Sequence, residues 1–335
     1  MISRPTAVAG PLPAGLAPGA PVLSVVTPAY NEADNLPPLY ERLRLALADM
    51  DWEWIAVDDH SRDTTFERLA EIAHSDRRVS AIRLARNSGS HIALTCGIEH
   101  AVGACVAIMA ADLQDPPEIL PLLVDKWRAG SQVVWATRAT RQGETMTTRG
   151  FSRLYYFIMR RIVGMKELPP AGADFFLLDR RVINACARFR ETNVSFLSLV
   201  TWMGFRQTSI SYTKEPRRHG RSGWSLEKKL KMVVDSVTSF SYLPIRAMSY
   251  LGFLIAMFGF LYASVVILNA LRGHPVEGWS SLMVVLLLVS GIQSLMMGVL
   301  GEYLWRALDE SRRRPRYLVE AVTGRIDEGP ARPGA

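Results

Sequence analysis

Three oxygen-bearing side chains, Asp112, Gln114 and Asp115, follow an apolar run at residues 104–110. The run is typical of a buried parallel strand, and the prolines at 116 and 117 fit the first turn of a helix. In an open α/β sheet, ligands bind outside the carboxyl ends of the strands. Oxygen ligands at that edge can hold a hard divalent cation and, with it, a diphosphate. The alternative is a plain helix start at which Asp115 is the N-cap.

The elements that would position these side chains alternate along the chain. Apolar strands are predicted at 22–27, 52–57, 79–84 and 104–110, and each precedes a helix, at about 36–48, 64–73, 91–100 and 118–129. Strands at 132–137, 171–178 and 207–214 and helices near 148–164, 181–189 and 195–203 continue the series. This order predicts an α/β fold with a doubly wound, mostly parallel sheet. The loop that carries Asp58 and Asp59 then lies at the same sheet edge as Asp112.

Two long apolar segments follow this domain. Residues 247–271 and 278–301 contain no Asp, Glu, Lys or Arg. Each is longer than the roughly 20 residues that a helix needs to cross a hydrocarbon core. Because only residues 272–277 separate them, a transmembrane hairpin is favoured over two buried helices of a soluble protein.

Charge around the hairpin predicts its orientation. Lys and Arg residues cluster outside its two ends, at 228–246 and 306–316, whereas the connecting loop carries Arg272 alone. The positive-inside rule therefore places the large domain and both chain ends in the cytoplasm, with the hairpin in the plasma membrane, the inner membrane of a bacterium. The net charge of +7 favours lipid head groups and phosphate ligands and argues against nucleic acid.

The expected organisation has six parts. Residues 1–21 form a disordered leader and 22–216 the α/β domain. Residues 217–246 are a basic hinge with an amphipathic helix in the membrane interface. Two transmembrane helices, 247–271 and 278–301, precede a cytoplasmic basic tail at 302–335.

Several motifs in this order resemble one family. They are Thr-Pro-Ala-Tyr-Asn-Glu at 27–32, Val-Asp-Asp-His-Ser-Arg-Asp at 57–63, Asp-Leu-Gln-Asp-Pro-Pro-Glu at 112–118, Asp-Phe at 174–175 with Leu-Asp-Arg at 178–180, and Gly220 with Ser222. The chain resembles, over residues 24–306, the family 2 inverting glycosyltransferases that load a sugar onto a polyprenyl phosphate. Bactoprenol glucosyltransferases, dolichol-phosphate mannose synthases and the undecaprenyl-phosphate aminoarabinose transferase belong to this type. The resemblance implies a Rossmann-like GT-A fold, a nucleotide-sugar donor that is a UDP-sugar such as UDP-glucose, and undecaprenyl phosphate as acceptor at the lipid bilayer.

The resemblance also implies roles for individual residues. The cation, Mg²⁺ or Mn²⁺, would be held by Asp112 and Gln114. The nucleotide sugar would contact Pro28, Tyr30, Glu32, Val57, Asp59, Asp112, Arg138, Arg149 and Arg217. The acceptor phosphate would contact Arg149, Arg217, Ser222, Lys228 and Lys229.

The expected chemistry is displacement of a diphosphate by a phosphate oxygen. A divalent ion and Arg138 would neutralise the charge that develops on the leaving group. A phosphate monoester, with a second pKa of about 6, is already ionised at neutral pH, so no strong general base is needed. Asp174 would orient the acceptor or an arginine.

Three positions depart from the family pattern. Ala110 replaces the first carboxylate of the usual Asp-x-Asp motif, which puts metal affinity in doubt. Phe176 replaces an arginine, and Gly223 replaces a lysine for which Lys228 or Lys229 could substitute.

Other interpretations remain open. Asp58 and Asp59 could be turn residues, Tyr30 a core residue, and Arg138 and Arg149 surface charges; the hinge could simply attract lipid. At the level of function, Ala110 motivates a membrane-anchored assembly protein with a degenerate transferase domain. A processive polysaccharide synthase would need a Gln-x-x-Arg-Trp motif and further spans, and the sequence has neither. The sugar, the lipid length and a homo-oligomeric state are not determined by the sequence.

Overall fold

The computed structural model describes residues 20–138, 157–162, 174–189, 196–215, 243–272, 278–312 and 314–326. These residues form an eight-stranded sheet in the order β7-β5-β6-β4-β1-β2-β3-β8. The strands are β1 Leu23–Ala29, β2 Trp52–Asp58, β3 Val79–Leu84, β4 Cys105–Ile108, β5 Val133–Arg138, β6 Phe175–Asp179, β7 Gln207–Tyr212 and β8 Val319–Gly324.

Most strand pairs in the sheet are parallel. β4, β1, β2 and β3 run parallel to one another, and β5 runs parallel to β7. β6 lies antiparallel between β4 and β5, and β8 lies antiparallel beside β3. The predicted α/β fold with a mostly parallel sheet is therefore confirmed.

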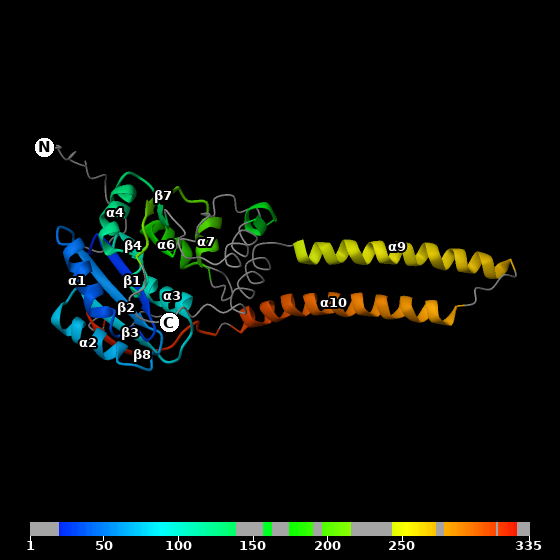
Figure 1. Ribbon diagram of the computed structural model, residues 1–335, viewed down its shortest axis with the longest axis horizontal. Helices are drawn as coiled ribbons and strands as arrows, with labels where there is room; N and C mark the ends of the chain where they lie inside the picture. Colours follow the sequence, from blue (N-terminus) through cyan, green and yellow to red (C-terminus); the bar gives the residue numbers. More distant parts are fainter. Residues whose placement is uncertain are drawn as a thin grey trace.

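Helices cover both faces of the sheet (Figure 1). Apolar residues of α1 (Leu36–Ala46), α2 (Thr65–Ser75) and α4 (Leu120–Arg128) share one buried cluster with the strands. Those of α3 (Ser90–His100), α6 (Arg180–Cys186) and α7 (Phe196–Trp202) share the second cluster. A 3₁₀ turn at Pro117–Ile119 precedes α4, and a π-helical turn occupies Ile158–Ile162.

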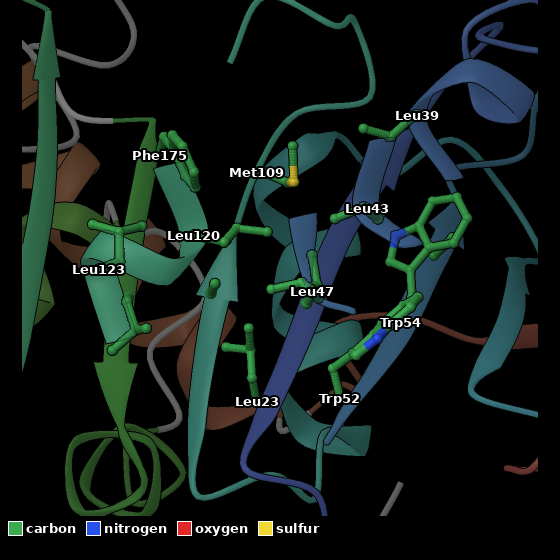
Figure 2. Packing of buried hydrophobic residues seen from close by; sticks show 14 of the residues in the cluster. Leu23, Leu39, Leu43, Leu47, Trp52, Trp54, Met109, Leu120, Leu123 and Phe175 are labelled. Carbon is green, nitrogen blue, oxygen red and sulfur yellow. The ribbon is translucent and has the colours of Figure 1, made fainter. Parts of the chain in front are cut away.

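The first cluster shows why these segments fold as they do. In α1, Leu36, Leu39 and Leu43 recur at helical spacing and are fully buried. Figure 2 shows Leu39 and Leu43 beside Trp54 of β2, and Leu120 and Leu123 of α4 near Phe175 of β6. Burial of such a side chain contributes about 1.5–3 kcal/mol, so this face holds the loops above it on a rigid platform.

Two long helices, α9 (Leu243–Leu271) and α10 (Trp279–Ser311), lie side by side and project away from the sheet domain (Figure 1). Both are long and apolar enough to cross a membrane, over Ile245–Asn269 and Leu282–Asp309, and neither apolar window is buried within the protein. A Cβ added to Gly252 of α9 would lie 3.1 Å from Met296 Cε of α10, so this glycine permits close packing. The two predicted spans fall within these helices.

The segment after residue 301 differs from the expected tail. Its first ten residues continue α10 with an ion pair between Glu302 and Arg306, and Val319–Gly324 forms the edge strand β8. The isolated sequence carries no strong strand signal there, and pairing with the open edge of β3 supplies the missing hydrogen bonds. The predicted interface helix, most of the hinge and residues 1–19 of the leader lie outside the described residues.

Candidate active site

The loops that follow β1, β2 and β4 adopt unusual backbone conformations. Asn31, His60 and Leu113 have φ values of 55°, 59° and 58°, and they are the only residues other than glycine with positive φ in the described part of the chain. Each conformation of this kind costs about 1–3 kcal/mol and persists where the surrounding structure enforces it. One such residue occupies each of three loops at the carboxyl ends of parallel strands, where ligands bind in α/β sheets.

The first two of these loops are hydrogen-bonded to each other. The backbone N–H of Asn31 donates to Ser61 Oγ at 2.9 Å, and the N–H of Arg62 donates to Asn31 Oδ1 at 2.9 Å. The N–H of Glu32 donates to Thr65 Oγ1 at 2.9 Å. The two motifs that suggested the nucleotide pocket therefore form one rigid unit.

The aspartates of the second loop are buried and build it. Asp58 Oδ1 accepts the N–H of Ser61 at 2.9 Å, and burial raises the pKa of Asp58. Asp59 accepts the N–H groups of Ser88 and Gly89, at 2.7 and 2.8 Å, with its two carboxylate oxygens. Burial also raises the pKa of Asp59, although these bonds oppose the shift. Both aspartates therefore shape the loop, as the turn interpretation proposed, and a contact between Asp59 and the nucleotide stays a prediction.

Other residues predicted to line the nucleotide pocket differ in access. Tyr30 is 40% exposed beyond the end of β1, so its interpretation as a core residue is wrong. Pro28 and Glu32 are half-buried. The side chain of Val57 is fully buried in the second core cluster, so the predicted contact could involve only its backbone. Val57 is the penultimate residue of β2, and its side chain faces α3, where a Cβ added to Gly97 would lie 3.2 Å from Val57 Cγ2.

The loop after β4 presents the two predicted metal ligands. Asp112 and Gln114 are half-buried on either side of the buried Leu113. Asp112 Oδ1 accepts the N–H of Gln114 at 3.2 Å, and Gln114 Nε2 donates to the carbonyl oxygen of Glu215 at 3.4 Å. We call residues 112–115 the metal loop.

The number of protein ligands in the metal loop indicates which kind of cation it suits. Among the described residues, no group of three His, Cys, Asp or Glu side chains could hold a metal ion. One carboxylate and one amide oxygen suit a Mg²⁺-like ion whose remaining ligands are diphosphate oxygens and water. The donor set thus fits a cation that enters together with a diphosphate rather than a metal held by the protein alone.

Asp115 anchors this loop instead of capping a helix. Its side chain is fully buried, and Oδ1 accepts a hydrogen bond from Tyr212 Oη and lies 3.5 Å from Lys214 Nζ. Neither the 3₁₀ turn nor α4 has a side-chain cap, so the N-cap interpretation is wrong. Burial and the neighbouring carboxylate raise the pKa of Tyr212. The end of β7 therefore holds the metal loop in place.

Arg138 and Asp174 meet beside this anchor. Arg138, the last residue of β5, pairs with Tyr212 in the β5–β7 ladder. Its Nη2 lies 3.2 Å from Asp174 Oδ2, in an ion pair between side chains that are 26% and 62% exposed. The predicted orientation of an arginine by Asp174 agrees with this geometry. Arg138 is partly exposed, and it is held close to the strand end that anchors the metal loop.

Other predictions fall elsewhere. Phe176 is buried against Trp135 and Phe196, so this replacement of an arginine serves the second core cluster. The predicted contacts Arg149, Arg217, Ser222, Lys228 and Lys229 lie outside the described residues. Sequence reasoning missed Tyr212 and Lys214, because only the path of β7 brings them to Asp115.

The site can now be compared with known proteins. The model of glycosyl transferase family 2 matches residues 24–186. An uncharacterized glycosyltransferase of Synechocystis sp. is 41% identical over 305 residues, which cover 90% of this chain and 96% of that protein. The bactoprenol glucosyl transferase of Shigella phage SfV is 33% identical over 301 residues, 89% of this chain and 98% of that protein. Glucosyl-3-phosphoglycerate synthase of Mycobacterium tuberculosis, solved with Mn²⁺, uridine diphosphate and phosphoglyceric acid, matches 70% of this chain and 84% of its own with a TM-score of 0.48 and 17% identity.

The matches to the first two relatives cover about nine tenths of the chain. They cover far more than the 163 residues of the family model, and they confirm the resemblance that the motifs suggested. The chain belongs to glycosyl transferase family 2 and is a glycosyltransferase with the GT-A fold.

Proposed function

We propose that the protein transfers a hexose from a UDP-sugar to polyprenyl phosphate, with inversion at the anomeric carbon and release of UDP. The observation that carries this proposal is that Asp115 ties the loop of Asp112 and Gln114 to Tyr212, which lies opposite Arg138 in the sheet. Arg138 is paired with Asp174, and the same chain carries two membrane-length helices. Relatives named bactoprenol glucosyl transferase support the lipid acceptor. Glucose as the transferred sugar follows those names alone.

The site residues that the structure describes have separate roles in the proposed reaction. Asp112 and Gln114 would hold Mg²⁺ or Mn²⁺, which would supply positive charge for the leaving diphosphate. Arg138 adds a positive charge that Asp174 keeps in place. Tyr30 and the hydrogen-bonded loops after β1 and β2 form the wall for the nucleotide. The acceptor phosphate needs no general base because it is ionised at neutral pH, its second pKa being about 6.

The proposed location follows from the same parts. α9 and α10 span the inner membrane as a hairpin, with the catalytic domain and both termini in the cytoplasm. The segment 217–231, which carries the basic residues Arg217, Lys228 and Lys229 together with Ser222, would then be on the side of the anionic head groups and could meet the lipid phosphate.

The test is a transfer assay with the purified full-length protein. Undecaprenyl phosphate, Mn²⁺ or Mg²⁺ and a panel of radiolabelled UDP- and GDP-sugars are incubated with the protein, and lipid-linked label is extracted into organic solvent. Asp112→Asn is the inactive control, and Asp125→Asn, an exposed residue of α4, is the matched neutral control. Absence of lipid-linked label from every donor would refute the proposal.

Ala110 and the two-ligand metal loop favour a second candidate, an assembly protein with a degenerate transferase domain. It predicts that calorimetry detects no binding of UDP in the presence of Mn²⁺. It also predicts that Asp112→Asn changes nothing beyond stability. One titration of the wild-type protein therefore separates the two candidates.

A further inference from the structure

Arg42 of α1 binds two glutamates that come from distant parts of the chain. Its Nε and Nη2 donate to the two carboxylate oxygens of Glu118, at 2.9 and 2.7 Å. Its Nη2 and Nη1 also donate to the two oxygens of Glu215, at 2.8 and 3.2 Å. A single guanidinium thus makes paired hydrogen bonds to both carboxylates. The hydrogen bonds from Arg42 lower the pKa of Glu118.

Both glutamates are connected to the metal loop, Glu118 through the chain and Glu215 through hydrogen bonds. Glu118 belongs to the 3₁₀ turn that directly follows the loop, and Glu215 lies just beyond β7. The backbone of Glu215 is hydrogen-bonded to Gln114 in both directions: its N–H donates to Gln114 O at 2.8 Å, and its carbonyl oxygen accepts from Gln114 Nε2 at 3.4 Å. Arg42 therefore connects the end of the loop to the strand extension that holds a predicted metal ligand.

We propose that Arg42 is a positioning residue for the metal loop. Its hydrogen bonds to both Glu118 and Glu215 fix the position of Gln114. This inference rests on the proposed function insofar as Gln114 is taken to hold the cation. It assigns to α1 a role that the motifs do not show. Arg42 lies ten residues beyond the first motif and 70 residues before Asp112 in the sequence.

The geometry separates this contact from an ordinary surface ion pair. An exposed pair contributes little, because water screens it and both side chains lose freedom. Arg42 is only 21% exposed, and it satisfies two carboxylates with the fork that a lysine cannot reproduce. Arg44 on the same helix offers the contrast, since it is 49% exposed and pairs with Glu41, three residues away.

The contact also lies at a junction of two predicted binding regions. In the sequence, Glu215 lies two residues before Arg217, a predicted contact of the donor and acceptor phosphates. Residues that orient metal ligands through hydrogen bonds typically change metal affinity by about 10–100-fold when they are removed.

The first measurement is binding by the full-length protein in detergent. UDP is titrated calorimetrically in the presence of Mn²⁺ into the wild type, Arg42→Ala, Arg42→Lys and the matched control Arg44→Ala. We expect Arg42→Ala to weaken binding about tenfold or more. Arg44→Ala is expected to stay within about twofold of the wild type, since it removes only a screened surface pair. Arg42→Lys is expected to fall between them, since it keeps the charge without the fork. Equal affinities for Arg42→Ala and Arg44→Ala would overturn the proposal.

A second measurement does not depend on ligand or activity. Hydrogen exchange, followed by mass spectrometry, is compared for peptides that cover residues 112–118 and 212–215. Because the N–H of Glu215 donates to Gln114, exchange there is expected to accelerate in Arg42→Ala and to remain unchanged in Arg44→Ala. Unchanged protection in Arg42→Ala would overturn the proposal even if the variant lost affinity.

One outcome separates this inference from the proposed function. If the wild type binds no UDP with Mn²⁺ but Arg42→Ala loosens the loop, the donor assignment fails while the positioning role stands.

Combining Arg42→Ala with Glu215→Gln tests whether Arg42 acts on Gln114 through Glu215. Both changes break the same contact, so the double variant should lose no more affinity for UDP than Arg42→Ala alone. Additive losses would contradict action through Glu215.

Discussion

Tyr212 donates a hydrogen bond from its hydroxyl group to the fully buried carboxylate of Asp115. The bond joins the end of β7 to the metal loop, across 97 residues of sequence. Asp115 Oδ2 has no hydrogen-bond partner within the described residues, so the carboxylate depends strongly on the bond at its other oxygen. A buried charge with so few partners makes this contact sensitive to mutation.

Tyr212→Phe is therefore expected to destabilise the protein by about 1–3 kcal/mol, because it leaves Asp115 with Lys214 as its remaining neighbour. Thermal melting in detergent checks the prediction. Tyr40→Phe is the matched control: Tyr40 Oη donates to Asp76 at 2.9 Å, but that carboxylate also accepts bonds from Arg78. The prediction is wrong if both variants melt alike.

Removal of the metal ligand should abolish transfer without unfolding the domain. Asp112→Asn keeps the size of the side chain and removes its charge, so we expect activity to fall by about 10²-fold or more with an unchanged melting temperature. EDTA should have the same effect on the wild type, reversible by Mn²⁺. Full activity in the presence of the chelator would contradict a metal-dependent mechanism.

Ala110→Asp tests the departure from the Asp-x-Asp pattern. The substitution adds a carboxylate two residues before Asp112, and we expect it to tighten Mn²⁺ binding because a third oxygen ligand becomes available. Ala111→Asp is a poor site for the same charge, since Ala111 is buried in the first core cluster. The measurement is the Mn²⁺ concentration that gives half-maximal binding of UDP. An unchanged value would show that residue 110 does not face the cation.

Asp58 and Asp76 should respond to acid in opposite directions. Burial raises the pKa of Asp58, so the folded protein binds this proton more tightly than the unfolded chain. The contribution of Asp58 to stability then rises as the pH falls from above the folded pKa toward the unfolded value of about 4. Hydrogen bonds from Arg78 lower the pKa of Asp76 to about 2, so its contribution is present above about pH 4 and is lost between about pH 4 and 2.

Melting temperatures between pH 3 and 8 test this pair. Asp58→Asn is expected to flatten the rise of the melting temperature on acidification, because asparagine does not take up a proton. The loop should stay folded, since the amide oxygen can still accept the N–H of Ser61. Asp76→Asn is expected to lower stability at neutral pH and to remove part of the loss in acid. Identical pH profiles for the two variants and the wild type would refute both assignments.

Truncation after residue 313 should destabilise the catalytic domain, although the removed segment follows the two long apolar helices α9 and α10. It deletes β8, exposes the edge of β3 and removes Tyr317 and Val322 from the second core cluster. A loss of at least about 2 kcal/mol is expected from the buried apolar surface. Truncation after residue 326 is the control, because it keeps β8 intact. Equal melting of the two truncated proteins would contradict a structural role for β8.

Most helices and strands could be predicted from local pattern. Leu36, Leu39 and Leu43 recur at helical spacing, and the apolar run at 52–57 reads as a strand, because a buried face leaves a period in the sequence. The two Asp-bearing loops, after β2 and β4, were predicted at one edge, since the carboxyl ends of parallel strands meet at the same edge of a sheet. β8 escaped prediction because its partner β3 lies about 240 residues earlier in the chain.

The sequence by itself determined the family, the alternating α/β order, the two membrane-length helices and the residue types of the metal loop, because these depend on periodicity and on short motifs. Only the tertiary structure decided that Asp115 binds Tyr212 instead of capping a helix, that the side chain of Val57 faces the core, and that Arg42 joins Glu118 to Glu215. The physical reason is that such contacts depend on where strands and helices that are distant in the sequence end in space. The periodicity of a sequence reports local structure and does not contain that information.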